Sequence, residues 1–266
     1  MSQPKITVVT TTYRPWDRLL LQLADLKMQT FREFKWVVVD DLFGQRPFRL
    51  EAAFPIVHCL PKGGVVHHFA PARADNTALA YAEGELVYWM NDYVRLVPAV
   101  LERHWAIYER YGPKVVIMGL LEPMDAQMPF PPRHFDYSIA PNLGECDCGS
   151  GVWQYSAGRN DSAPLKELLA LNGLDESFDG DRGGSDVDLA MRLLMNGNRL
   201  LVDTQARCFE YAHHADSNPS YAWEKVLPQK GTWDKLAKGY RPARIRAHNE
   251  WDIAKARESI VGQGTC

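Results

Sequence analysis

The chain has 266 residues, 46% of them hydrophobic, and a formal net charge of −3. That length is enough to bury a full core, and we expect one domain with a C-terminal extension. The charge balance gives no basic field of the kind that nucleic-acid binding needs, so we expect no nucleic-acid partner.

The chain contains no run of about 18 apolar residues, and its first residues lead straight into a strand pattern. We therefore expect no integral membrane segment and a cytoplasmic protein. The five cysteines are odd in number and lack C-x-x-C spacing, which argues against a disulfide framework or a structural zinc site. We interpret Cys146 and Cys148 as thiols of a loop.

The N-terminal part alternates between strand and helix patterns. Residues 5–11 and 34–39 are β-branched runs, and leucines recur between them at helical spacing after Asp17, the expected N-cap. This is a β–α–β unit, which predicts parallel strands in an α/β fold with a mostly parallel sheet. The expected elements that follow are strands over 56–60, 86–90, 115–121 and 199–203, helices over 71–82, 98–110, 164–171 and 186–195, and an irregular connection over 122–151.

Acidic side chains follow two of the expected strands. Asp40 and Asp41 come directly after one strand, and Asp92 comes just after another. Each acid alone is explained by a turn, because Asp bonds its own backbone well there. In open α/β sheets, however, ligands bind at the carboxyl ends of the strands, so acids at two such ends predict a nucleotide site.

A second group of acids precedes an amphipathic helix. Ser185 and Asp188 have the spacing of a capping box, which accounts for Asp188. That account leaves Asp186 available to face a cleft. A carboxylate there could act as a general base toward a substrate hydroxyl.

Two histidine pairs are candidate ligands for a metal or a phosphate. His213 and His214 follow the last expected strand, and His67 and His68 precede the expected helix over 71–82. Histidine is a common metal ligand, but a packed or solvated histidine is the more frequent case.

These segments together resemble glycosyltransferase family 2, the nucleotide-sugar-dependent enzymes of the GT-A fold. The resemblance runs in order from about residue 5 to 214 and implies a GT-A domain over 1–215, with a nucleotide-binding half over 1–95, an acceptor-binding half over 96–215 and an extension over 216–266. The matching segments are Thr10-Thr11-Thr12-Tyr13 with Pro15, Gln29-Thr30-Phe31, Val37-Val38-Val39-Asp40-Asp41, Ala72-Arg73 with Asn76 and Gly84-Glu85, Asn91-Asp92-Tyr93 with Pro98, Gly173-Leu174-Asp175-Glu176, and Ser185-Asp186-Val187-Asp188-Leu189.

The resemblance implies that the donor is a nucleoside-diphosphate sugar, which we expect to be a UDP-sugar. Tyr13 would stack on the nucleobase, Asp41 would bind it, and Thr11 would line the same pocket. The other residues implied for the nucleotide sugar are Arg73, Asn76, Asn91 and Asp92.

The resemblance also implies an inverting transfer. Asp186 would be the catalytic base that deprotonates an acceptor hydroxyl, which then attacks the anomeric carbon in line with the departing nucleoside diphosphate. The acceptor would be a glycan or another hydroxyl compound. Its expected contacts are Trp153, Asp175 and Glu176.

The metal motif of the family is altered here, because Tyr93 stands where a carboxylate is expected. A phenol is a poor ligand for Mg²⁺ or Mn²⁺. Either Asp92 holds the ion together with His213 or His214, or the protein works weakly or without a metal. In the second case the candidates to balance the diphosphate charge are Arg73, Arg95 and the lysines of the C-terminal segment.

A second class of function stays open: a GT-A-fold protein that binds nucleotide or glycan and transfers nothing. Asn91, Tyr93 and Ser185 favour it, because each departs from the family pattern, whereas the retained Asp186 favours the enzyme. A nucleotidyltransferase is disfavoured, since no Gly-rich phosphate loop follows the first strand. The basic and aromatic segment over 231–266 predicts either a lid or acceptor arm, or a solvated helix packed by its tryptophans.

Overall fold

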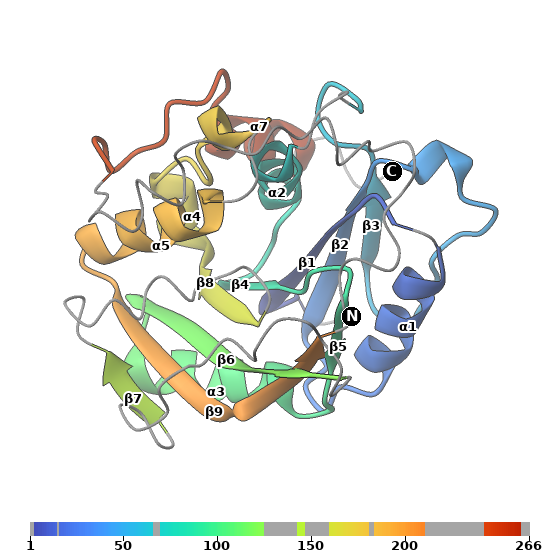
Figure 1. Ribbon diagram of the computed structural model, residues 1–266, viewed down its shortest axis with the longest axis horizontal. Helices are drawn as coiled ribbons and strands as arrows, with labels where there is room; N and C mark the ends of the chain where they lie inside the picture. The colour runs from blue at the N-terminus through green and yellow to red at the C-terminus, as the bar shows by residue number, and fades with distance from the viewer. Residues whose placement is uncertain are drawn as a thin grey trace.

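A twisted sheet with helices on both faces forms the centre of the computed structural model (Figure 1), which describes residues 3–14, 16–65, 70–124, 143–146, 160–180, 184–210 and 242–261. The helices are α1 (Trp16–Lys27), η1 (Phe43–Gln45), α2 (Pro71–Ala80), α3 (Val100–Tyr111), α4 (Leu165–Ala170), η4 (Glu176–Phe178), α5 (Ser185–Met195) and α7 (Ile253–Val261). The strands are β1 (Ile6–Thr12), β2 (Phe34–Asp40), β3 (Ile56–Cys59), β4 (Leu86–Trp89), β5 (Val94–Leu96), β6 (Val115–Pro123), β7 (Leu143–Cys146), β8 (Asp161–Pro164) and β9 (Arg199–Glu210).

The first half of the sheet is parallel, in the order β3-β2-β1-β4. Strands β2 and β4 are buried along their whole length, as expected for parallel strands that are covered on both faces. The predicted β–α–β unit is therefore confirmed. The predicted cap is wrong, because α1 begins at Trp16 and so includes Asp17 in its first turn.

Two apolar cores lie on opposite faces of this half-sheet. Val9 and Val37 point into one core, which is closed by α2, α4, α5 and α7. Val8 and Trp36, the neighbouring residues on the same strands, point into the other core, which is closed by α1 and α3. Figure 1 shows these two groups of helices on either side of the sheet.

The second half of the sheet contains both directions. Strand β8 runs antiparallel between β4 and β6, β6 is parallel to β9, and β5 and β7 pair antiparallel with β9. The β6–β9 register shifts after Gly119, where an added Cβ would lie 2.2 Å from Asn160 Nδ2 and 2.3 Å from the Ala206 carbonyl oxygen. A glycine is needed there because the side chain of Asn160 fills the irregularity, donating to the carbonyls of Leu120 and Ala206.

The C-terminal residues that the structure describes pack onto the sheet's helices. Ile253 of α7 is fully buried in the core beside α2, and Arg257 donates to the carbonyl of Ala82 at 2.8 Å. Of the basic and aromatic segment over 231–266, residues 231–241 and 262–266 lie outside the described residues. Among those described, no helix combines the length and the apolar character that crossing a membrane requires.

Candidate functional site

The ends of β1 and β4 are joined through the carboxylate of Asp92. Its Oδ2 accepts a hydrogen bond from Thr12 Oγ1 at 2.8 Å, and its Oδ1 lies 3.2 Å from Nε of Arg14. The hydroxyl oxygen of Thr12 in turn accepts from the backbone N–H of Arg14 at 3.1 Å. Asp92 is only 4% exposed, so this acid is a buried partner of the loop that follows β1.

The guanidinium of Arg14 contacts two aromatic rings. Its Cζ lies 5.1 Å from the ring centroid of Tyr13 and 5.2 Å from that of Tyr93. Arg14 also donates to the hydroxyl of Tyr13 at 3.2 Å, and Asn91 donates to the hydroxyl of Tyr93 at 2.8 Å. The strand edge therefore contains a buried cation that faces one carboxylate and two π systems, an arrangement that stabilises the charge.

The described residues of this edge do not fit a divalent cation. Mg²⁺ and Mn²⁺ require several oxygen ligands, but Asp92 is already engaged by a hydroxyl and a guanidinium, and the Tyr93 oxygen accepts from an amide. In the described part of the chain, no group of three or more His, Cys, Asp and Glu side chains could hold a metal ion. His213 and His214, the expected co-ligands, lie outside that part.

The two acids after β2 have different surroundings. Asp40 is fully buried; Arg46 donates to it from two nitrogens at 2.7 and 2.8 Å, and His58 Nε2 lies 2.9 Å away. Burial alone would raise the pKa of Asp40, but the hydrogen bonds from His58 and Arg46 outweigh it and hold that pKa below its ordinary value. Asp41 is half-buried, and its backbone N–H donates to the carbonyl of Thr12 at 3.0 Å, which places it beside the end of β1.

Asp186 lies in the first turn of α5, partly exposed, between buried neighbours. Its Oδ1 accepts from the backbone N–H of Val187 at 2.9 Å. The predicted capping box is wrong: the N-cap is Gly184, at φ +100°, and a glycine has no side chain with which to cap. Asp188 instead pairs with Arg192 one turn later, at 2.7 Å.

Helix α2 contacts α5, the helix that carries Asp186. Burial raises the pKa of Asp75 on α2 well above its ordinary value, and the nearby charges of Asp179 and Asp186 raise it further. Asp179 accepts the backbone N–H groups of Ala72 at 2.9 Å and Arg73 at 3.0 Å, so it caps α2 from another segment. The side chain of Arg73 turns away from this cap, and its Nε donates to the carbonyl of Lys62 at 2.6 Å.

We expect a stability change with pH from Asp179. Burial raises the pKa of this carboxyl to about 7 despite its two backbone hydrogen bonds. A raised carboxyl pKa means that the folded protein keeps a proton that the unfolded chain loses, so stability falls as the pH rises from about 4 to 7. Replacing Asp179 with Asn keeps one of the two capping oxygens without the charge, and it removes the pH-dependent loss of stability, which is on the order of 2–4 kcal/mol.

Urea unfolding of the wild type and of Asp179→Asn at pH 5 and pH 8 checks this expectation. The difference in stability between the two proteins shifts in favour of the variant as the pH rises from 5 to 8. Equal differences at the two pH values would show that Asp179 does not titrate between them.

The loop over 172–176 is fixed from α2 by Asn76. This amide is fully buried; its nitrogen donates to the Leu174 carbonyl and to Glu176 Oε1, both at 2.9 Å, and its oxygen accepts from the Leu174 N–H at 2.8 Å. All of its hydrogen-bonding groups are thus engaged by protein. In this structure Asn76 positions the loop, and the nucleotide contact that its motif implied stays a prediction.

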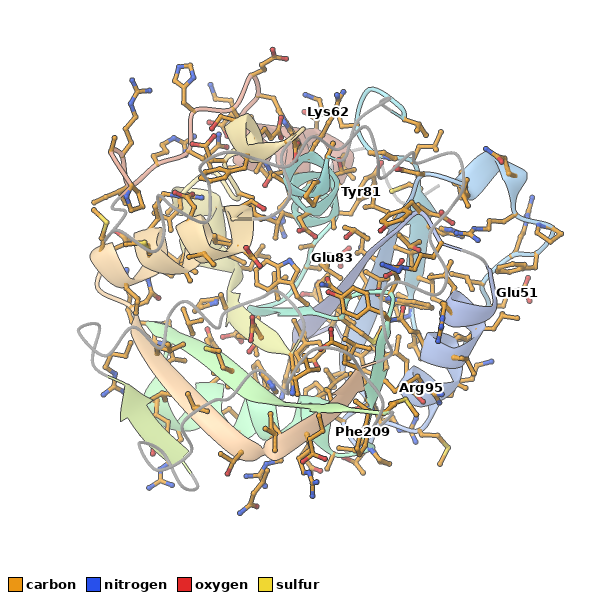
Figure 2. The ribbon with its side chains drawn as sticks, in the orientation of Figure 1. Glu51, Lys62, Tyr81, Glu83, Arg95 and Phe209 are labelled. Atoms are coloured by element: carbon orange, nitrogen blue, oxygen red, sulfur yellow. The ribbon has the colours of Figure 1, made fainter. Side chains whose placement is uncertain are left out.

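The two acids expected to contact the acceptor also bind protein groups. Asp175 accepts from the Ser177 N–H at 2.9 Å, and Glu176 accepts from Asn76 and from Nε1 of Trp251 at 2.7 Å. The ammonium of Lys62, labelled beside α2 and α7 in Figure 2, lies 4.1 Å from the centroid of the Trp251 ring.

Sequence reasoning missed the C-terminal contribution to this loop. Asn249 donates to the carbonyls of Asn172 and Leu174 at 2.8 and 2.9 Å and accepts from the Glu176 N–H at 3.0 Å. The available signal was Asn172 followed by Gly173, two residues that tolerate the positive φ found at both positions (58° and 65°). Such a loop needs outside partners for its exposed backbone groups.

Other predicted site residues are not part of this geometry. Trp153, His67, His68 and Cys148 lie outside the described residues. Cys146 ends β7, so its expected place in a loop is wrong.

Comparison with known proteins adds to these observations. No family model matches the chain, and no curated protein matches it. Solved structures of Staphylococcus aureus TarS do. TarS residues 1–349 in complex with UDP-GlcNAc align with a TM-score of 0.66 and 17% identity over 82% of this chain and 61% of that one. The chain has the GT-A fold.

Two further TarS structures give similar values. The UDP complex of residues 1–349 has a TM-score of 0.62 and 18% identity over 83% of this chain and 63% of that one. A longer TarS chain has a TM-score of 0.62 and 18% identity over 78% of this chain and 36% of its own. The chain thus spans less than two thirds of the TarS chains that it matches, and the predicted GT-A architecture is confirmed.

Proposed function

We propose that the protein is a glycosyltransferase that uses a nucleoside-diphosphate sugar, and that the donor is a UDP-sugar, as expected for a relative of glycosyltransferase family 2. The observation that supports this most is the GT-A fold, shared with a TarS structure that holds UDP-GlcNAc and another that holds UDP. At 17–18% sequence identity, these structures share the fold with this chain, and the UDP-sugar donor is our proposal.

The nucleotide would bind across the ends of β1 and β2. Thr11 is near the end of β1, Tyr13 directly follows that strand, and Asp41 directly follows the neighbouring strand β2. The ring of a tyrosine can stack on a nucleobase, and a carboxylate can accept a hydrogen bond from the imide N–H of uracil. Together, these two contacts would select uracil, the pyrimidine that has such an N–H donor. Asp40 is excluded from this role because Arg46 and His58 already engage its oxygens.

Asp186 would act as the base of a single displacement with inversion. Its carboxylate takes the proton from an acceptor hydroxyl, and that oxygen forms a bond to the anomeric carbon. The bond from the anomeric carbon to the diphosphate oxygen breaks at the same time, and the departing nucleoside diphosphate keeps the electron pair. Asp186 is suited to this role because it is the partly exposed acid of a turn whose neighbours are buried.

A panel of nucleotide sugars tests this proposal, with release of the nucleoside diphosphate as the readout. One UDP-sugar gives release, and Asp186→Asn lowers the rate at least about 100-fold, within the range for loss of a general base. UDP affinity is expected to stay unchanged, because the proposed base acts on the acceptor hydroxyl. Glu109→Gln, an exposed change on α3, is the matched control and keeps full activity.

Release that is equally fast in Asp186→Asn would reject Asp186 as the base. UDP binding without release from any donor would reject the transferase and favour a nucleotide-binding protein of the same fold.

A further inference from the structure

A donor diphosphate carries negative charge that the site must balance, most of all as the sugar departs. The described residues around Asp92 do not fit a divalent cation, yet the same place contains a permanent cation. Arg14 lies between the ends of β1 and β4, 3.2 Å from Asp92 and against the rings of Tyr13 and Tyr93.

We propose that Arg14 supplies the positive charge for the donor diphosphate in place of a divalent cation, and that donor binding is independent of metal. This inference rests on the proposed function, because it assumes a nucleoside-diphosphate donor. A guanidinium suits this role because it stays charged at all physiological pH values and because its fork of N–H groups matches phosphate oxygens.

The position of Arg14 also explains why a metal is disfavoured there. A divalent ion that used Asp92 would share that carboxylate with the guanidinium and would lie close to it, and two cations repel strongly in a buried site. Tyr93 also favours a cation from the protein over a metal ion. Its ring contacts the guanidinium, whereas an acid at that position would attract a metal.

Other arginines near the sheet are engaged elsewhere. Arg95 binds both oxygens of Asp25 on α1 at 2.6 Å, and Figure 2 places it on the opposite side of the view from Lys62. Arg46 is bound to Asp40. Arg95, one candidate for charge balance from the sequence, is therefore replaced by Arg14 in this proposal.

Arg14 is 4% exposed, so the diphosphate must reach it by displacing a covering group. Tyr13 and Tyr93 are both only partly buried, and the resemblance assigns Tyr13 to base stacking. Rotation of the Tyr13 side chain onto the base would uncover one face of the guanidinium as the donor binds.

Calorimetric titration with UDP and with uridine tests the proposal. The wild type binds UDP with the same dissociation constant, within twofold, in EDTA and in Mn²⁺. Arg14→Gln weakens UDP binding at least tenfold in EDTA and changes uridine binding far less, because uridine has no phosphate and meets Arg14 only through Tyr13. Arg207→Gln, which removes a largely exposed arginine of β9, leaves both affinities unchanged.

A second readout does not depend on the variant folding. The electron paramagnetic resonance signal of free Mn²⁺, recorded in a solution that already contains UDP, falls no further when wild-type protein is added. UDP binding that requires Mn²⁺, or a further loss of that signal on adding the protein, would overturn the inference and leave the transferase proposal standing. Absence of UDP binding in both conditions would overturn the two together.

Discussion

Replacing Arg192 with Met is expected to lower the free energy of unfolding by about 3–5 kcal/mol, the usual cost of removing one partner of a buried ion pair. Arg192 and Asp188 are 1% and 2% exposed, and their atoms Nε and Oδ2 lie 2.7 Å apart. The change leaves the Asp188 carboxylate buried without its guanidinium. It also removes the 2.9 Å hydrogen bond from Arg192 to the carbonyl of Gly173.

Urea unfolding measures this loss of stability, and two further variants serve as comparisons. Arg207→Met breaks a far more exposed pair with Glu122 and is expected to cost less than about 1 kcal/mol. The double change Asp188→Leu with Arg192→Met removes both charges and is expected to recover much of the loss. A cost below about 1 kcal/mol for Arg192→Met alone would mean that water or another group replaces the lost partner.

The sequence predicts the parallel half of the sheet well, because intrinsic preference and burial act together there. Residues 34–39 are aromatic or β-branched except Lys35, and they are buried on both faces in β2. Strand β8 is different. Its sequence, Asp161 to Pro164, has little preference for a strand, and it is extended because β4 and β6 pair with it on both sides. Pairing between segments far apart in the chain is not visible in a local pattern.

In the candidate site, too, the local sequence predicts some features and contacts between distant segments decide the others. Spacing alone marks Asp188 as part of a capping box, but the identical residue can also pair with an arginine four positions later, as it does with Arg192. Asp92 is found from its place after a strand, whereas its partner Arg14 follows a different strand. Residue type gives the candidates for a site, and the fold decides which charges meet.

The loop over 172–176 shows how distant segments fix one site. Asn76 enters it from α2, Arg192 from α5 and Asn249 from the C-terminal segment, and all three bind its backbone groups. These donors and acceptors compensate for backbone groups that no helix or strand pairs. The described part of the expected C-terminal extension, residues 242–261, therefore contributes to the same unit as α2 and α5, the helix that carries Asp186.

Gly173→Ala should be strongly destabilising, by about 3 kcal/mol, for two reasons that add. The residue has φ +65°, a conformation that costs an alanine about 1–2 kcal/mol. The new Cβ would also lie 2.2 Å from Asn76 Oδ1 and 2.6 Å from Ile253 Cδ1. Relief of that contact requires Asn76 to give up its bond to the buried Leu174 N–H, which costs roughly 1–3 kcal/mol.

Gly197→Ala is the matched control, because Gly197 has φ +80° and an added Cβ would meet nothing within 4 Å. Its expected cost is the conformational part alone, about 1–2 kcal/mol. Urea unfolding of the two variants therefore isolates the effect of crowding against Asn76. If Gly173→Ala costs no more than Gly197→Ala, the loop can move away from α2 freely, and Asn76 does not hold it.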